Sequence, residues 1–147
     1  MNGRDAFVAS FRELQPKFSR MYAQMLGRLD LTLPQYNLLY QLLPLGTVSM
    51  SEISERLEIT KPAVTNLVDR LEEKKFLRRI PHTKDRRVIL LEILAKGKKV
   101  ITDIQGQSLA IILNAYDRFN ASEHETISRF YTAVSKSMDD YSLRSNK

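Results

Sequence analysis

The chain contains no cysteine and no tryptophan among its 147 residues. The lack of cysteine excludes thiol redox sensing, disulfide bonds and thiolate metal sites. No apolar run approaches the roughly 20 residues that a membrane-spanning helix needs. The first residues also lack the apolar stretch of about 7–15 residues that marks a signal peptide. We therefore expect a cytoplasmic protein with no membrane partner.

The sequence also lacks the motifs of catalytic and cofactor sites. No acid and nucleophile accompany either histidine, His82 or His124, in the pattern of a hydrolytic site. The acidic run around His124 lacks the second histidine of a zinc-binding helix, and no glycine-rich phosphate loop is present. We expect no enzymatic activity, no metal and no cofactor, and we interpret His124 as a solvent-exposed residue.

One short segment, residues 74–87, carries an excess of charge equal to the net charge of the whole chain, +6. It holds seven basic residues and one acid, Asp85, whereas the rest of the chain has sixteen bases and sixteen acids. A concentrated positive segment attracts a polyanion, because binding releases the counterions of nucleic-acid phosphates. A solvated charged loop is the alternative interpretation, so the elements on either side of the segment decide between the two.

Apolar residues recur every three or four positions along most of the chain, which predicts a mainly α protein. Residues 5–29 form the first helical run, where Pro16 predicts a kink or a split into two helices. A second helix, apolar nearly all round, is expected over residues 34–43, because Pro34 suits a first helical turn and Pro44 is a breaker.

Two short helices joined by three residues then predict a helix-turn-helix. Ser49 and Glu52 spell a capping box that opens the first helix, which runs through Leu57. Thr60 can cap the second helix, whose inward face is apolar. Its outward face carries Pro62, Thr65, Asn66, Asp69 and Arg70. Asn and Arg are the side chains that bind adenine and guanine edges, although an ordinary polar surface remains the alternative.

The periodicity changes after this helix. Residues 76–80 and 88–93 suit β-strands, and the residues between them are turn formers and charges. The basic segment is therefore expected to form a β-hairpin directly after the helix-turn-helix. A basic hairpin tip can enter a DNA minor groove, whose negative potential favours inserted Arg.

Three stretches resemble the MarR family of bacterial transcription regulators: residues 60–74 (TKPAVTNLVDRLEEK), Asp85-Arg86-Arg87, and Leu94-Ala95-Lys96-Gly97. The resemblance covers residues 33–97. It implies a mainly α fold, a winged helix-turn-helix with a two-stranded β wing, plus N- and C-terminal helices that form a dimerisation bundle. The expected parts of this single intertwined domain are 1–32 for dimerisation, 33–94 for DNA binding and 95–147 for dimerisation.

The resemblance also implies the residues that contact double-stranded DNA. The helix from Thr60 would enter the major groove, using Thr60, Lys61, Pro62, Ala63, Thr65, Asn66 and Arg70. The hairpin would act as the wing, using Arg79, His82, Lys84, Asp85, Arg86 and Arg87. In the family the Asp of the wing braces the Arg that reaches the minor groove, which places these roles on Asp85 and Arg87. Residues i and i+2 of an extended chain lie on the same side, so the two side chains can meet.

Two positions depart from the family pattern. Ala95 stands where the family usually has a Thr that caps the next helix, so this cap is missing or displaced. Asn66 stands where members often carry Arg or Lys, which shifts the expected base from guanine toward adenine.

The C-terminal third predicts two long helices. One runs from Lys98 to Phe119, and Ser122 with Glu125 spells a capping box for the other. Helices of this length exceed what one small domain can cover, which favours a homodimer; a bundle within one subunit is the alternative.

The implied function is that of a sequence-specific transcription regulator, a repressor relieved by a small molecule. The family binds small aromatic or lipophilic effectors, and Met25, Tyr36 and Tyr40 could line such a cleft. A plain core role for these three residues is the alternative. A protein-interaction module with the same fold is a further alternative, but it would not require the basic hairpin.

Overall fold

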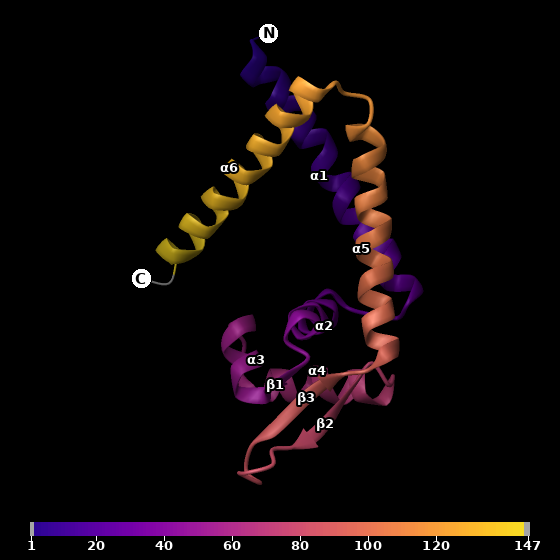
Figure 1. Ribbon diagram of the computed structural model, residues 1–147, viewed down its shortest axis with the longest axis vertical. Helices are drawn as coiled ribbons and strands as arrows, with labels where there is room; N and C mark the ends of the chain where they lie inside the picture. The colour runs from indigo at the N-terminus through magenta and orange to yellow at the C-terminus, as the bar shows by residue number, and fades with distance from the viewer. Residues whose placement is uncertain (1, 146–147) are drawn as a thin grey trace. The chain divides into compact units, whose positions relative to one another are not determined.

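The computed structural model describes residues 2–145, and within them the chain forms six helices and three strands (Figure 1). Residues 1–104 and 105–147 are two compact units, and each is described by itself. The elements are α1 (Gly3–Arg28), α2 (Leu33–Leu45), β1 (Thr47–Ser49), α3 (Met50–Leu57), α4 (Lys61–Glu73), β2 (Leu77–Pro81), β3 (Ile89–Ile93), α5 (Ala95–Tyr116) and α6 (Ala121–Ser145). The predicted mainly α winged helix-turn-helix is confirmed.

Helix α1 is continuous through Pro16, so the predicted split into two helices is wrong. A proline removes one backbone donor, which leaves the carbonyl of Arg12, four residues earlier, without its helical partner. Arg12 is exposed, so water can satisfy that carbonyl. The helix is also fixed at its start by a capping box between Asn2 and Asp5.

Helix α2 passes through Pro44 and ends two residues later than the sequence predicted. Its start agrees with the prediction, because Pro34 lies in the first turn and Thr32 caps the helix through Gln35. The C-terminal stop is Gly46, which has a φ of 72° and donates its N–H to the carbonyl of Leu42. The glycine rather than the proline ends this helix, since a left-handed φ suits Gly and few other residues.

Helices α3 and α4 form the predicted helix-turn-helix. The Ser49 hydroxyl accepts the N–H of Glu52, and the Thr60 hydroxyl accepts the N–H of Ala63. The capping box predicted at α3 is only half formed, because the Glu52 carboxylate binds Arg56 instead of the backbone. Glu58 takes the left-handed conformation, with a φ of 53°, that turns the chain between the helices.

The sheet has three antiparallel strands in the order β1-β3-β2. Strands β2 and β3 form the predicted hairpin, with Leu77 opposite Ile93 and Arg78 opposite Glu92. Strand β1 was not predicted, and it adds to the outer edge of β3 with Val48 opposite Leu91. Three residues are too short a segment to show an alternating pattern, so the sequence carried no signal for this strand.

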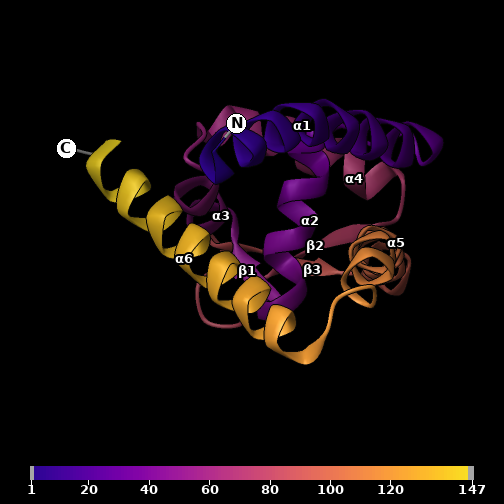
Figure 2. The same ribbon diagram turned by 90° about the horizontal axis from the view of Figure 1, so that it is seen from above.

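One apolar core joins these elements in the first unit. Helix α2 packs against α3, α4 and the sheet, as Figures 1 and 2 show. The largest fully buried side chains include Leu38, Leu39 and Leu42 of α2, Ile53 of α3, and Val64, Val68 and Leu71 of α4, together with Leu77, Leu91, Ile101 and Ile104. The core fixes α4 with its inward stripe covered, so its opposite face must point to solvent.

The start of α5 lies against the segment between α4 and β2 at Gly97. A Cβ atom at Gly97 would overlap the backbone carbonyl oxygen of Phe76 and meet the Ile93 side chain at 3.0 Å. The same carbonyl accepts the N–H of Leu94 at 2.9 Å. The helix begins at Ala95, and the carbonyl of Leu94 accepts the first helical N–H, from Lys98. Close backbone packing at Gly97 therefore fixes this end of the helix, where the sequence lacks the capping Thr.

In the second unit, the turn after α5 is fixed by side chains that the sequence analysis assigned differently. The capping box at α6 is Asn120 with Glu123, so the predicted box of Ser122 and Glu125 is wrong. Asn is as good a helix cap as Ser, and it lies two residues earlier. His124 is not a solvent residue, because its ring stacks on Tyr116 at 3.9 Å and its Nε2 lies 2.8 Å from the Tyr116 carbonyl oxygen.

Helix α5 ends at Tyr116, so Phe119 lies beyond it. Both α5, with 22 residues, and α6, with 25, are as long as predicted. Among the described residues, none of the helices combines the length and apolar character needed to cross a bilayer.

Gly97→Ala should lower the free energy of unfolding by about 1–3 kcal/mol, because overpacking against a backbone carbonyl forces the helix to shift. Gly106→Ala, in the same helix with nothing within 4 Å of the added atom, should instead raise it by about 0.4–1 kcal/mol. Urea unfolding at one fixed protein concentration measures both. Equal stability of the Gly97 variant and the parent would show that the close packing is not a constraint.

Candidate nucleic-acid interface

The outward face of α4 is open to solvent along its length. Thr65, Asn66, Asp69 and Arg70 are exposed, as are Lys61 and Pro62, whereas Ala63 is half-buried. Val64 and Val68 lie on the opposite face and are fully buried. The sequence therefore assigned the two faces of this helix correctly.

Two of the predicted contact residues on α4 use their hydroxyl groups within the helix. Thr60 caps the N-terminus, and the Thr65 hydroxyl donates to the carbonyl of Lys61 at 3.1 Å. Asn66 and Arg70 are the long polar side chains on the exposed face. Arg70 lies 3.6 Å from the Glu73 carboxylate with 70% of its side chain exposed, so its guanidinium can reach an external partner.

Arg79, which the resemblance implied as a DNA-contacting residue of the wing, is paired with two carboxylates of α4. Its guanidinium donates to Asp69 at 2.5 Å and to Glu72 at 2.6 Å, and only 27% of its side chain is exposed. Its backbone N–H also donates to Glu72 at 2.9 Å. These bonds tie β2 to α4, so the charge of Arg79 is neutralised inside the protein.

Glu72 is the carboxylate at the centre of this tie. The backbone N–H of Arg79, followed by the Arg79 guanidinium, holds the pKa of Glu72 below its usual value. Glu72 and Asp69 lie three residues apart on α4 and so share one side of the helix. That spacing is visible in the sequence, but it does not show which base the pair will meet.

The fold neutralises two further bases of the basic segment. Lys74 donates to the carbonyl and the carboxylate of Asp30, and Arg78 pairs with Glu92 across the hairpin at 2.5 Å. Together with Asp69 and Glu72, four carboxylates from outside the segment thus face its bases. The excess charge of the segment is therefore reduced at its base, where the hairpin joins the body.

Positive charge remains toward the tip of the hairpin. Lys84, Arg86 and Arg87 are exposed, and so is Lys75 at the end of α4. The tip projects beyond the strands β2 and β3 (Figure 1). A cationic tip beside an exposed polar helix is the arrangement that the winged helix-turn-helix prediction requires.

The predicted ion pair between Asp85 and Arg87 is present. The Asp85 carboxylate accepts the Arg87 guanidinium at 3.2 and 3.4 Å and the Arg87 backbone N–H at 3.0 Å. The backbone hydrogen bond, and then the guanidinium, lower the pKa of Asp85. The residues lie in a turn rather than in an extended strand, so the side-to-side argument from strand geometry was wrong although the pair exists. Arg87 keeps 91% of its side chain exposed.

The residues predicted to line a ligand cleft lie together between α1 and α2. Tyr36 is 8% exposed, and its ring lies 6.4 Å from Tyr22 and 6.0 Å from Tyr40. Met25 is half-buried against the same core. Burial raises the pKa of Tyr36 above its usual value. Tyr40 is 45% exposed and is the ring of this cluster that a ligand could reach.

Metal binding has no support among the described side chains. They contain no group of three or more His, Asp or Glu residues arranged to hold an ion.

The fold and the exposed face of α4 define a winged helix-turn-helix protein, and comparison with known proteins shows which family it resembles. A sequence model described as the MarR family matches residues 31–89. The HTH-type transcriptional repressor MdtR of Bacillus subtilis is 39% identical over 101 residues, which cover 66% of this chain and 65% of that protein. Over these residues the chain is similar to the MarR family.

Solved structures agree with this assignment. The YusO protein from Bacillus subtilis has a TM-score of 0.73 at 27% identity, with 92% of this chain and 99% of that chain covered. The S. aureus MepR–DNA complex has a TM-score of 0.72 at 23% identity, with 87% of this chain and 96% of that chain covered. At its lower identity, the second likeness shows the fold alone.

Glu72→Gln should lower the free energy of unfolding by about 1 kcal/mol at pH 7, the low end for hydrogen bonds to charged groups in a partly exposed position. The folded-state pKa of Glu72 lies below 4.5, so its contribution is complete above that pH and is lost as the pH falls through the folded value. The difference between parent and variant should therefore shrink below pH 4.5.

Glu73→Gln is the matched control for this change, because Glu73 is exposed and lies 3.6 Å from Arg70 without a bond to the hairpin among the described residues. Urea unfolding across the acid range should show a much smaller effect for this variant than for Glu72→Gln. Equal effects of the two variants at every pH would contradict the role given to Glu72.

Proposed function

We propose that this protein is a MarR-family transcription regulator that binds double-stranded DNA as a homodimer. The main support for the proposal is that Arg79 joins the exposed face of α4 to the basic hairpin. The exposed face of α4, with Asn66 and Arg70, is tied through Asp69 and Glu72 to the hairpin that ends in Arg87. A helix that reads bases and a cationic tip are thereby held as one rigid unit.

The chemistry of each surface fits a different part of the duplex. A helix fits the major groove, where Asn can bind adenine and Arg can bind guanine with two hydrogen bonds each. The tip fits the narrower minor groove, which attracts Arg, and Lys84 and Arg86 can neutralise phosphates beside it. The MepR complex, which has the same fold, was solved with DNA bound. Arg79 acts in this proposal by holding the wing in place rather than by touching DNA.

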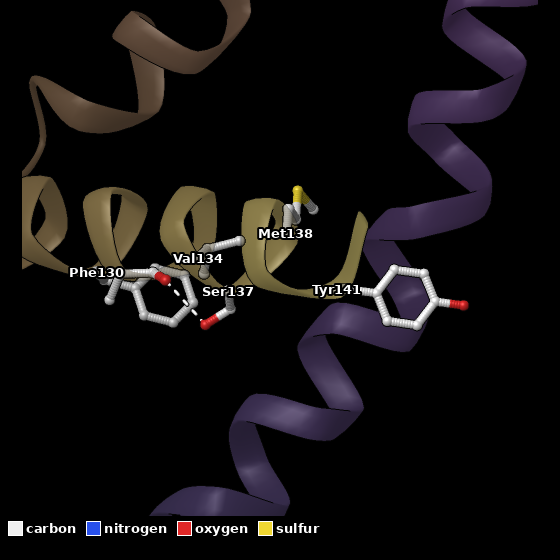
Figure 3. Close-up of a pocket in the computed structure, with 6 residues that line it drawn as sticks. Phe130, Val134, Ser137, Met138 and Tyr141 are labelled. Atoms are coloured by element: carbon white, nitrogen blue, oxygen red, sulfur yellow. Dashed lines mark hydrogen bonds between the residues drawn. The ribbon is translucent and has the colours of Figure 1, made fainter. Parts of the chain in front are cut away.

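Exposed apolar side chains on the terminal helices support the homodimer. Helix α1 exposes Phe11 and Leu14. On α6, a shallow hollow is lined by Phe130, Ala133, Val134, Ser137, Met138 and Tyr141, as Figure 3 shows. These residues recur at steps of three and four, which is the spacing of a helix that packs against another helix. Two chains related by a two-fold axis would place their α4 helices about 10 base pairs apart on a pseudo-palindromic site.

We infer that the protein acts in the cytoplasm as a repressor. MdtR, the relative at 39% identity, is named a transcriptional repressor. Relief by a small aromatic or lipophilic molecule belongs to the same proposal, and the tyrosines of α1 and α2 support it through the exposed ring of Tyr40. No catalytic role is proposed.

Asn66→Ala and Arg70→Ala should each weaken binding to a selected specific duplex by about 1–3 kcal/mol, because each removes a contact to a base edge. Binding to a random duplex should change much less. Fluorescence anisotropy with both duplexes at one salt concentration measures the two effects. Arg12→Ala, which removes an exposed positive charge from α1, is the control for general electrostatics. Equal losses on both duplexes would show that Asn66 and Arg70 contact phosphates only.

Arg87→Ala should lower affinity for the specific duplex and reduce the slope of log K against log salt by about one. Asp85→Ala tests the brace more sharply. Removal of an acid from a basic tip should tighten binding if only net charge matters, whereas loss of the brace should weaken it severalfold. Asp85→Asn, which retains an acceptor for the Arg87 N–H but not the charge, should fall between Asp85→Ala and the parent. Tighter binding by Asp85→Ala at equal salt would contradict the bracing role.

A further inference from the structure

The tip of the wing, residues 82–88, is a turn closed by two backbone hydrogen bonds. The N–H of His82 donates to the carbonyl of Val88 at 3.1 Å, and the N–H of Val88 donates to the carbonyl of Asp85 at 3.0 Å. The residues between them lie outside the β ladder, which ends at Pro81 and Ile89. Their N–H groups therefore depend on side chains or water for acceptors.

The ring of His82 supplies the acceptor for two of these N–H groups. Its Nδ1 atom lies 3.2 Å from the backbone N of Lys84 and 3.2 Å from the backbone N of Asp85. A ring nitrogen that accepts hydrogen bonds carries no proton, so the neutral ring must carry its hydrogen on Nε2. Asp and Asn side chains often accept backbone N–H groups in turns, and here a histidine does so.

The hydrogen bonds of His82 lead directly to the arginine at the tip. His82 fixes the peptide group on the N-terminal side of Asp85. The Asp85 carboxylate then fixes Arg87 through both its backbone N–H and its guanidinium. Two side chains in succession, His82 and then Asp85, thus determine where Arg87 points.

The position of His82 distinguishes this role from direct contact with DNA. A histidine that mainly binds phosphate would be expected to turn its ring nitrogens toward solvent. His82 is half-buried, whereas Lys84, Arg86 and Arg87 around it are exposed. Its Nδ1 faces the backbone of its own turn, so only Nε2 is left for an external partner.

We propose, building on the DNA-binding function above, that His82 is a positioning residue of the wing that acts on DNA affinity through Asp85 and Arg87. The ring shapes the tip in the free protein, before DNA is present. An arginine that is already oriented loses less conformational entropy when it enters the groove.

Two conservative variants separate positioning from direct contact. The side-chain oxygen of Asn lies at the place of histidine Nδ1, so His82→Asn keeps an acceptor for the two backbone N–H groups. The amide of Gln lies at the place of Nε2, so His82→Gln keeps a donor toward solvent but loses the internal acceptor. His82→Ala removes both. None of the three residues introduces a charge.

Affinity for the specific duplex should be higher in the variant that keeps an acceptor for the backbone N–H groups of Lys84 and Asp85. We expect His82→Asn to bind about three- to tenfold more tightly than His82→Gln and His82→Ala, the effect of one or two neutral hydrogen bonds. A direct phosphate contact through Nε2 predicts the reverse order, with the Gln variant binding more tightly. That order, or equal affinity of the Asn and Ala variants, would overturn the proposal.

A second measurement needs no DNA. Nitrogen-15 NMR of the free parent protein should show His82 with an unprotonated Nδ1 and a protonated Nε2. The backbone amide signals of Lys84 and Asp85 should move more in His82→Gln than in His82→Asn. A proton on Nδ1, or backbone amide signals of Lys84 and Asp85 that do not shift in His82→Gln, would overturn the proposal.

The two measurements also distinguish a failure of the role proposed for His82 from a failure of the proposed DNA-binding function. A parent protein that binds no duplex would refute that function and, with it, the effect on affinity. The NMR spectra would still show whether His82 shapes the tip.

Discussion

The carboxylates of Asp69 and Glu72 on α4 both bind the guanidinium of Arg79 on β2. The position of the hairpin beside α4 depends on these two ion pairs. Arg79 is held by Asp69, by Glu72 and through its own backbone N–H. Single exposed ion pairs contribute little to stability because both side chains lose freedom and water screens the charge. A partly buried arginine with several partners is fixed more firmly. The hairpin therefore keeps a defined direction relative to α4, although its tip has no core of its own.

The same ionic contacts redistribute the charge of the chain. Along the sequence, the excess charge extends over residues 74–87, but in the fold Asp30, Asp69, Glu72 and Glu92 neutralise the bases nearest the body. The charge that remains is concentrated on the tip, where Lys84, Arg86 and Arg87 lie. A narrow groove is better matched by a small charged tip than by a broad positive face. Orientation within that tip then depends on short-range hydrogen bonds, from His82 and Asp85, rather than on net charge.

Local signals in the sequence predicted the helices, the turn between α3 and α4 and the hairpin, and the resemblance to the MarR family implied the ion pair of Asp85 with Arg87. They failed where contacts distant in the sequence decide the outcome. Periodicity could not show that Pro16 and Pro44 would be tolerated within helices, nor that β1 would pair with β3. The partners of Arg79 and Lys74 lie on other elements, so the sequence did not show that these two bases pair with carboxylates. The cap of α6 was a local error, because Asn120 rather than Ser122 accepts the N–H of the third residue along.

We propose that α4 and the wing of two identical chains bind one duplex together. Hydroxyl-radical footprinting on a duplex selected from a random pool can test this arrangement, with the bound stoichiometry measured in the same solution. We expect two chains per duplex and two symmetric protected segments whose centres lie about 10 base pairs apart. Minor-groove protection by the wing should accompany each segment and should be lost in Arg87→Ala. One chain per duplex, or a single unsymmetric protected segment, would contradict the account.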